Sequence, residues 1–454
     1  MPASVVIDGT GNADVAIEAG AQYVFVEDHF AVQASHRPPR EVGASYMNGD
    51  IPALDDADPI NVRQVILDTP RGPQFDRGPL LDSRERRRIV GDYTLDWLDQ
   101  INRRTFPDSI VYARSDYDSH GYQIHPYFML KPARPPGEHA RQFYSYVPYR
   151  CLLPRGMDGI LVTGVGCSAH RDAMPIIRMQ PDVHNQGYAA GVAAAMAAKA
   201  GITPRQINVK ALQKHLVEIG NLPSSVLTDG DSYPMSREKL SAAVQGIPRG
   251  FEGLEILMAQ PEDSLPLLRR AYASARDADR LAYAEVLGVM GDATGLPVLL
   301  AEAERLAAAK ATALPQGADP KSAPLPQPDE VTRLIWALGG AGDRQAAPRL
   351  AAMARDVDRS DATRTRAICV SLGRLGDPAG ADVLAEWVGA NRAEPGLREL
   401  LAACALYRCG DKDGLARTML ENIARGTNGP FARLAWQVLR GEPGKPASRR
   451  EATP

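Results

Sequence analysis

Hydrophobic and polar positions alternate in different ways in the two halves of the chain. Up to about residue 240, short apolar runs are separated by Gly, Pro and aromatic residues, which is typical of strands joined by loops. Beyond that point, Ala, Leu and Arg recur at the spacing of amphipathic helices. The change predicts an α/β part, an all-α part, and a domain boundary at residues 230–236, in the stretch DGDSYPMS.

The all-α part contains an internal repeat marked by a Gly-Asp pair. The pairs begin at Gly291, Gly342, Gly376 and Gly410, so the last two steps are both 34 residues, and a Pro-rich loop lengthens the first. Each unit predicts a helix that ends at a left-handed Gly, followed by an Asp that caps the next helix.

The same period occurs in tetratricopeptide repeats, whose Trp, Leu-Gly and Tyr positions are missing here. The units resemble short HEAT-type repeats of the phycobilisome-lyase kind over roughly residues 255–440. We therefore expect an all-α HEAT-like helical solenoid over residues 237–440, followed by a disordered tail at 441–454. Two roles for it stay open, since it can cover the first part of the chain or bind a protein partner.

Two glycine turns in the α/β part are candidates for a ligand site. In the first, a strand at Ser4–Ile7 leads into Gly9-Thr10-Gly11 and a helix at 13–19. In the second, an apolar run ends in Gly164-Val165-Gly166-Cys167-Ser168-Ala169, which fits G-x-G-x-x-A. A dinucleotide loop opens directly into a helix, whereas here prolines interrupt the next segment and we expect the helix to start at 185–191. The second turn is thus predicted to lie beside a ligand at a strand end.

Three segments of the α/β part resemble one protein family. They are VVIDGTGNADVAIEAGA, then RERRRIVGDYTLDWLDQINRRTFPDSI, and finally YVPYRCLLPRGMDGILVTGVGCSAHRDAMPIIRMQPDVHNQGYAAG. In this order, over roughly residues 1–222, they are similar to a large family of FAD-dependent oxidoreductases. The resemblance implies FAD as cofactor and an α/β fold: a Rossmann-like FAD domain formed by residues 1–35 and 148–229, with an α+β substrate domain inserted at 36–147.

The resemblance also implies roles for individual residues. Gly9, Thr10 and Gly11 would lie near the adenosine diphosphate half of FAD, and Gly164, Ser168 and Ala169 near the ribityl chain and flavin. The cofactor-binding helix start would be formed by Gln186, Gly187, Ala190 and Gly191. Arg178 would orient substrate or flavin, and His170, which stands beside the flavin strand, would be the catalytic base.

The chain departs from the family pattern at three places. Val165 replaces the Arg that usually follows the glycine at the position of Gly164, and His170-Arg171-Asp172 stands where Thr-His-Glu is common. The family also has a G-x-G-x-x-G turn roughly 100 residues or more before the segment with which this sequence opens. We therefore expect an incomplete FAD domain, either because the chain is a fragment, which we favour, or because a partner supplies the rest. Such a chain alone would hold FAD weakly or not at all.

The predicted substrate domain is rich in tyrosine and histidine. Its tyrosines are Tyr112, Tyr117, Tyr122, Tyr127, Tyr144, Tyr146 and Tyr149, and its histidines are His120, His125 and His139. Tyrosines suit a polar organic, carbohydrate-like substrate, but they are also common in ordinary sheets, which is the more frequent case. His120 and His125 are further candidates for the base.

Composition limits the other classes of function. The formal net charge of -3, without a block of like charges, gives no nucleic-acid footprint, and no apolar run reaches the length of a membrane span. Five cysteines without a C-x-x-C pair predict neither a disulfide framework nor a metal site, and favour a cytoplasmic setting. The family resemblance, in turn, implies hydride transfer from a small polar organic, carbohydrate-like substrate to FAD. The alternative is a non-catalytic scaffold that carries a remnant flavoprotein domain.

Overall fold

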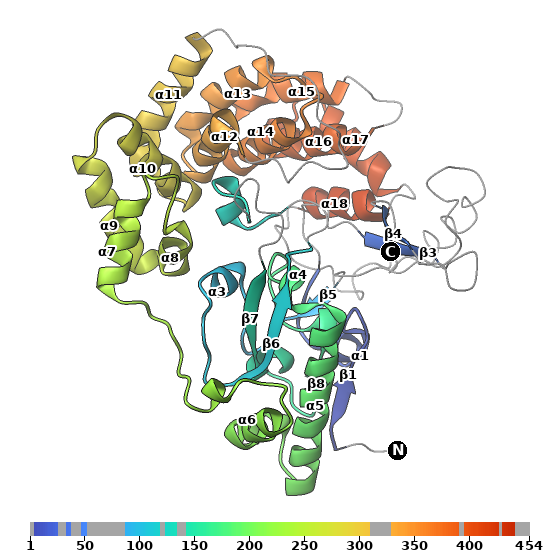
Figure 1. The fold of residues 1–454 in the computed structure, drawn as a ribbon. Helices are drawn as coiled ribbons and strands as arrows, with labels where there is room; N and C mark the ends of the chain where they lie inside the picture. The colour runs from blue at the N-terminus through green and yellow to red at the C-terminus, as the bar shows by residue number, and fades with distance from the viewer. Residues whose placement is uncertain are drawn as a thin grey trace.

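The computed structural model describes residues 4–25, 33–37, 47–51, 87–118, 123–133, 142–308, 328–389, 395–425 and 429–440. Half of the predicted substrate domain, with His120, Tyr122 and His139, lies outside these residues, as does the predicted tail. Figure 1 shows the long helix α5 (Gln180–Ala200) and all strands except those at 33–37 and 47–51 in the lower part of the molecule, with the helices of the second half arching above them.

Within the described residues, the α/β part contains four pairs of strands. β1 (Val6–Asp8) runs parallel to β8 (Ile160–Val162), with Asp8 opposite Val162. The other three pairs are antiparallel: β2 (Tyr23–Phe25) with β5 (Arg87–Ile89), β3 (Gln33–Arg37) with β4 (Met47–Ile51), and β6 (Ser109–Ser115) with β7 (Phe143–Pro148). The helices of this part are α1 (Asp14–Glu18), α3 (Trp97–Ile101), α4 (Met174–Ile177), α5 (Gln180–Ala200) and α6 (Val209–Glu218).

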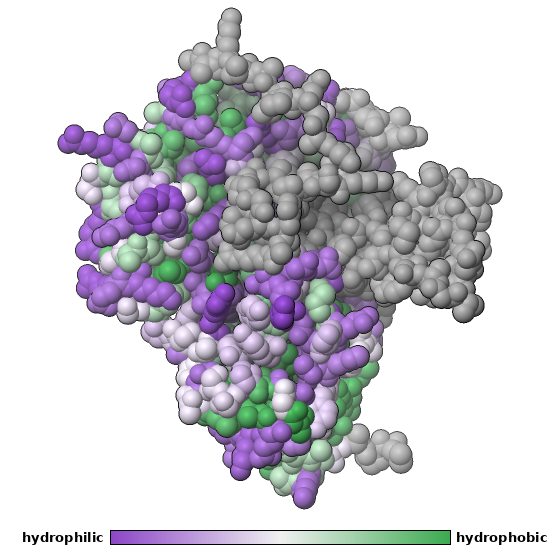
Figure 2. All heavy atoms as spheres, in the orientation of Figure 1, coloured by the Kyte–Doolittle hydropathy of each residue, from purple (hydrophilic) through white to green (hydrophobic). Residues whose placement is uncertain are grey.

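Aromatic packing forms the centre of the α/β core. Trp97 at the start of α3 is fully buried, and its ring lies 4.8 Å from Tyr117, 5.0 Å from Phe128 and 5.5 Å from Phe143 between centroids. Three polypeptide segments are thereby joined around one side chain. Hydrophobic residues also reach the surface near β1, where Figure 2 shows them over β1 and α5, and Val6, Ile7 and Val15 are 39 to 45% exposed.

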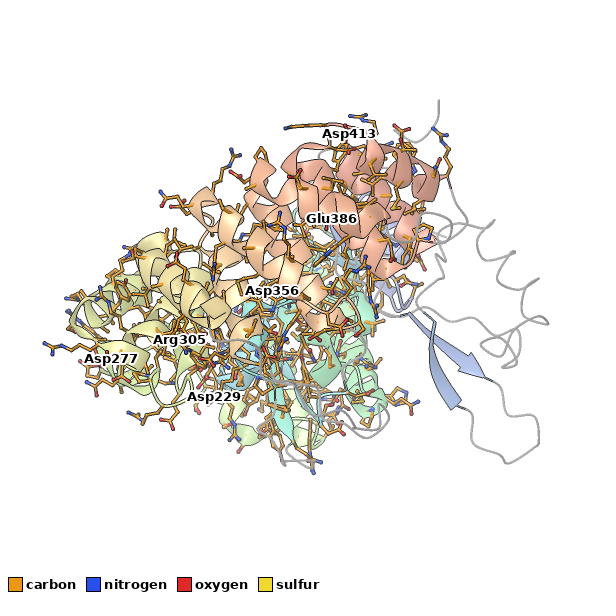
Figure 3. All side chains as sticks on the ribbon, turned by 90° about the horizontal axis from the view of Figure 1, so that it is seen from above. Asp229, Asp277, Arg305, Asp356, Glu386 and Asp413 are labelled. Atoms are coloured by element: carbon orange, nitrogen blue, oxygen red, sulfur yellow. The ribbon has the colours of Figure 1, made fainter. Side chains whose placement is uncertain are left out.

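The second half consists of helices. Their bounds are α7 (Arg237–Gly246), α8 (Leu254–Ala259), α9 (Pro261–Ser274), α10 (Asp277–Val289), α11 (Leu296–Ala308), α12 (Glu330–Gly340), α13 (Ala347–Asp356), α14 (Ala362–Leu375), α15 (Ala381–Gly389), α16 (Leu397–Gly410), α17 (Leu415–Ala424) and α18 (Gly429–Leu439). We call α10–α18 the helical array. In it α10, α12, α14 and α16 pack one against the next, and α11, α13, α15 and α17 form a second row. Seen from above, Asp277, Arg305, Asp356, Glu386 and Asp413 follow one another along the array (Figure 3).

The predicted ends of the repeat helices are confirmed. All four glycines, at 291, 342, 376 and 410, have a positive φ. Asp292, Asp343 and Asp377 each accept a hydrogen bond from the main-chain N–H two residues on, at 2.8 to 3.0 Å. The fourth unit differs, because the carboxylate of Asp411 accepts from the N–H of Arg417. Local capping chemistry therefore sets where most of these helices begin.

Small residues allow the first row of helices to approach closely. A Cβ built on Gly288 would lie 2.5 Å from the carbonyl oxygen of Ala337, and one on Gly339 would lie 2.3 Å from the Cβ of Ser371. Both glycines follow a buried leucine and precede the Gly-Asp pair by three residues. The Leu-Gly-x-x-Gly-Asp spacing therefore combines a close helix contact with a helix end.

Candidate functional site

The two predicted glycine turns lie side by side at the ends of parallel strands. β1 and β8 are adjacent, and the N–H of Thr163 donates to the carbonyl oxygen of Asp8 at 3.0 Å, directly beyond the paired residues. Gly9–Gly11 and Gly164–Gly166 therefore leave the sheet at the same edge. Carboxyl ends of parallel strands are where α/β proteins bind ligands.

The glycines of these turns serve different purposes. Gly164 has φ +69°, and a Cβ on Gly166 would lie 3.0 Å from the main-chain nitrogen of Ala13, so both glycines are required by the fold. Gly9 and Gly11 are exposed, and a Cβ there would lie 3.9 Å from Thr163 Oγ1 and 3.8 Å from Val165 Cγ2. The fold tolerates side chains at these two positions, so their bare backbone is available for close approach by a ligand.

Asp8 organises the first turn. Its buried carboxylate accepts hydrogen bonds from the N–H of Thr10 at 2.9 Å, from Thr10 Oγ1 at 2.6 Å and from the N–H of Ala16 at 2.8 Å. Thr10 Oγ1 in turn accepts from the N–H of Asp14 at 2.7 Å. The Thr10 hydroxyl thus shapes the turn, and Asp8 is a residue that the sequence analysis missed. An Asp followed by Gly-Thr-Gly is the signal that points to such a side-chain turn.

The predicted start of the helix after the second turn was wrong. α5 begins at Gln180 instead of within 185–191, because Pro181 stands in its first turn, where a missing N–H costs nothing. Residues 185–191 consequently lie inside the helix. Their main-chain N–H groups are too far from the helix start to face a ligand from it.

Gln186 connects α5 to the second turn. Its side chain is fully buried; Oε1 accepts from the N–H of Gly164 at 3.1 Å, and Nε2 donates to the carbonyl oxygen of Ile177 at 3.0 Å. Ala190 is also fully buried, whereas Gly187 and Gly191 are half-buried with open space at their Cβ positions. Gln186 therefore holds the turn in place, which is a different role from direct contact with a cofactor.

Ser168 and Ala169 join the second turn to residues 91–95. Ser168 is fully buried, and its Oγ lies 2.9 Å from the N–H of Gly91 and 2.8 Å from Thr94 Oγ1. Ala169 forms a parallel bridge with Leu95. Both hydrogen bonds of the Ser168 hydroxyl are thus made within the protein, which supports a structural role for this residue.

His170 follows Ala169 directly, and its ring faces that of His125. Its N–H donates to the carbonyl oxygen of Leu95 at 2.7 Å, and its ring lies 5.5 Å from the ring of His125 between centroids. Burial lowers the pKa of His170, which keeps the imidazole neutral. Its Nδ1 accepts the N–H of Asp172 at 3.2 Å, so the proton of the neutral ring resides on Nε2. His170 therefore presents a hydrogen-bond donor rather than the free lone pair of a base.

His125 and Asp96 form a pair beside His170. His125 Nδ1 accepts the N–H of Tyr127 at 3.1 Å, and its Nε2 lies 3.3 Å from Asp96 Oδ1. Burial raises the pKa of Asp96, but the hydrogen bond from His125 and the two imidazoles outweigh it, so the net pKa is lowered. Both ring nitrogens of His125 are thus occupied by protein groups, and this geometry does not favour His125 as a base.

Arg178 and the tyrosines occupy other places. Arg178 is buried and donates to the carbonyl oxygen of Asp118, with its carboxylate 3.3 Å away, which ties the end of β6 to the start of α5. Tyr117, Tyr127 and Tyr149 are buried in the core. Tyr112 is 40% exposed, and its ring lies 5.6 Å from that of Tyr144 and 4.8 Å from that of Tyr146.

Comparison with known proteins points to one family. Residues 70–216 match the family model described as FAD dependent oxidoreductase, and this segment includes Gly91, Gly164–Gly166 and His170. The segment is similar to that family. FAD is the cofactor expected of it. No curated protein matches the chain.

The residues at the sheet edge fit such a cofactor. The exposed backbone of Gly9 and Gly11 lies at the end of a parallel strand, beside the buried turn at Gly164–Gly166, and such strand ends are where α/β proteins bind dinucleotides. Among the described residues, no group of three or more His, Cys, Asp or Glu is arranged to hold a metal ion. Within the same part of the chain, no helix is long and apolar enough to cross a membrane.

Proposed function

We propose that this chain is the FAD-binding and catalytic part of an oxidoreductase that acts on a small polar organic, carbohydrate-like substrate. The observation that carries the proposal is the parallel pairing of β1 with β8, which brings the turns at Gly9–Gly11 and Gly164–Gly166 together. The family match over residues 70–216 supports the same cofactor from an independent direction. FAD, when bound, supplies the acceptor for the hydride of the substrate.

Each turn has a distinct part in this proposal. The exposed backbone of Gly9 and Gly11 would approach the adenosine diphosphate half, and the turn at Gly164 would lie near the flavin. Asp8 and Gln186 hold the two turns in shape from behind, through the hydrogen bonds described above. A rigid backbone matters here because amide groups stabilise an anionic ligand only when they are already oriented toward it.

His170 is the residue we place next to the substrate. Its Nε2–H would donate a hydrogen bond to a substrate oxygen, which orients the substrate and stabilises negative charge that develops on that oxygen. Because burial lowers its pKa, the ring stays a neutral donor at pH 7. Arg178 would act indirectly, by fixing the start of α5 relative to β6.

The test is saturable binding of FAD to the purified chain, followed by its absorbance and fluorescence. We expect the double substitution Gly9→Val and Gly11→Val to abolish binding, because branched side chains cover the backbone that the ligand must reach. Gly230→Val is the matched control, since Gly230 is an exposed glycine with open space at its Cβ position. If the chain binds no FAD, or if the double variant binds it as well as the wild type, the proposal fails. The non-catalytic scaffold then becomes the better description.

A further inference from the structure

Asp172 joins the two segments that carry His125 and His170. Its carboxylate is fully buried, and Oδ2 accepts the N–H of Ile124 at 2.7 Å and the N–H of His125 at 2.6 Å. The N–H of Asp172 itself donates to His170 Nδ1 at 3.2 Å. One residue thus fixes the main chain at His125 and the ring of His170.

The carboxylate of Asp172 is committed to these contacts. Its Oδ1 lies 2.8 Å from Nη1 of Arg171, which is also buried and balances the negative charge. Hydrogen bonds from main-chain N–H groups to a carboxylate are strong and directional. Asp172 therefore acts through the residues it orients, since its oxygens are already engaged by Arg171, Ile124 and His125.

The second half of the chain holds the same segment from the other side. Helices α8 and α12 both pack on the short helical turn Pro126–Met129, which follows His125. Arg366 on α14 donates from Nη2 to the carbonyl oxygen of Gln123 at 3.4 Å. Lys131 Nζ lies 3.4 Å from the carbonyl oxygen of Phe251 and 3.7 Å from Glu255 Oε2. Residues 123–131 are thus clamped between Asp172 and the helices.

We propose that Asp172 is a positioning residue through which the helices of the second half fix the orientation of the His170 ring. The inference rests on the proposed function only for the statement that His170 faces the substrate. The route is a continuous series of contacts. The helices pack on residues 123–131, and the N–H groups of Ile124 and His125 donate to the Asp172 carboxylate. The main-chain N–H of Asp172 then donates to His170 Nδ1. If residues 123–125 shift, the Asp172 carboxylate loses two hydrogen-bond donors. The main-chain N–H of Asp172 then turns away from His170 Nδ1.

Two measurements on the full chain test this route. Hydrogen exchange of the peptide covering residues 123–133 reports the clamp, and long-range ¹H–¹⁵N spectra of histidine-labelled protein report which ring nitrogen of His170 carries the proton. The His170 signal is assigned by its loss in His170→Gln. Other groups that face this ring are Asp96, His125 and Arg88, so the spectra are compared at one pH.

We expect Asp172→Asn to raise exchange at residues 124–125 by roughly ten-fold or more, since both hydrogen bonds then go to a neutral amide oxygen instead of a carboxylate. The His170 ring should then change from the Nε2–H form to a mixture of both forms. Arg366→Ala, which leaves the buried site intact, should produce a smaller change of the same kind in both measurements. Arg270→Ala is the matched control, because the hydrogen bond of Arg270 is to Pro266 in its own helix.

Two results would overturn the proposal. One is unchanged exchange at residues 124–125 in Asp172→Asn. The other is a His170 ring that stays fully in the Nε2–H form in both variants while exchange increases. If Asp172→Asn does not fold, Arg366→Ala decides by the same criteria. Neither measurement involves flavin, so a chain that binds no FAD but shows the expected changes would refute the proposed function and retain the positioning role.

Discussion

Gly91 lies so close to Ser168 that position 91 does not tolerate a side chain. The N–H of Gly91 donates to Ser168 Oγ at 2.9 Å, and a Cβ on Gly91 would lie 2.6 Å from the Cβ of Ser168. The same Cβ would lie 3.0 Å from the carbonyl oxygen of Tyr93 and 3.1 Å from that of Arg150. Two of the segments that resemble the flavoprotein family are thus fastened together at this point.

Gly91→Ala should therefore destabilise the chain. A methyl group cannot fit without a shift of backbone on two sides, and overpacking of this kind costs about 1–3 kcal/mol in the free energy of unfolding. Gly187→Ala is the control, because Gly187 lies inside α5 with open space at its Cβ position. That change should stabilise the chain by about 0.5–1 kcal/mol, as expected for Gly to Ala within a helix. Chemical denaturation of both variants checks the prediction, and equal stabilities would contradict it.

Gln186→Leu should weaken both stability and FAD binding. The substitution leaves the N–H of Gly164 and the carbonyl oxygen of Ile177 without their partner, at a cost of roughly 2–4 kcal/mol in the free energy of unfolding. On the proposed function, the loosened turn should also lower FAD affinity by about ten-fold or more, which is 1.4 kcal/mol or more.

Gln213→Leu provides the matched control for Gln186→Leu. Gln213 is an equally buried amide that donates to the carbonyl oxygens of Pro107 and Ser109, on α6 and away from the glycine turns. We expect a similar loss of stability without a change in FAD affinity. If both variants lose FAD affinity equally, the loss reflects general destabilisation. The turn at Gly164 then has no specific role in FAD binding.

Local chemistry explains which predictions from the sequence were right. The helix ends at Gly376 and Asp377 depend on residues within one or two positions, and the structure confirms them. The start of α5 was misplaced because Pro181 was taken as an interruption, although proline is well suited to the first turn of a helix. The close contact of Gly339 with Ser371 depends on which helices are neighbours, and a single sequence does not contain that information directly.

The candidate site was harder to predict than the repeats. Its glycine turns are visible as short motifs, but the bonds from Ile124 and His125 to Asp172 join positions 48 and 47 residues apart. Sequence spacing does not predict such contacts. These residues are brought together by the packing around Trp97 and by the helices that pack on Pro126–Met129. The sequence suggests His170 as a candidate, whereas the form of its ring depends on a hydrogen bond that only the structure reveals.

Glu285 should make the stability of the helical array depend on pH. Burial raises its pKa to about 7, an effect that Arg333, 3.5 Å away, reduces and that Glu330 and Glu302 increase. The folded state therefore binds the proton more tightly than the unfolded state. The contribution of Glu285 to the free energy of unfolding is fully present below pH 4.5, the ordinary pKa of a glutamate. This contribution is lost as pH rises through about 7.

Glu285→Gln should remove this dependence. Between pH 4.5 and pH 8 the free energy of unfolding of the wild type should fall by about 2–3 kcal/mol. That of the variant should change much less, because the amide carries no charge to desolvate. Denaturation at several pH values measures the difference. Glu386→Gln, an exposed change on α15, is the control and should follow the wild type. A variant whose stability falls with pH as steeply as that of the wild type would show that Glu285 is not the group responsible.

The form of the His170 ring leads to opposite expectations for two substitutions. A glutamine amide places an N–H donor near the position of Nε2, whereas an asparagine amide reaches only the position of Nδ1. If His170 acts as a donor from Nε2, His170→Gln should retain roughly a tenth of the activity, while His170→Asn should lose about a hundred-fold or more. Activity is measured with a panel of sugars and sugar alcohols, by the loss of flavin absorbance without oxygen. Comparable losses in the two variants, or better activity in His170→Asn, would instead support a base at this position, because neither amide can accept a proton from the substrate.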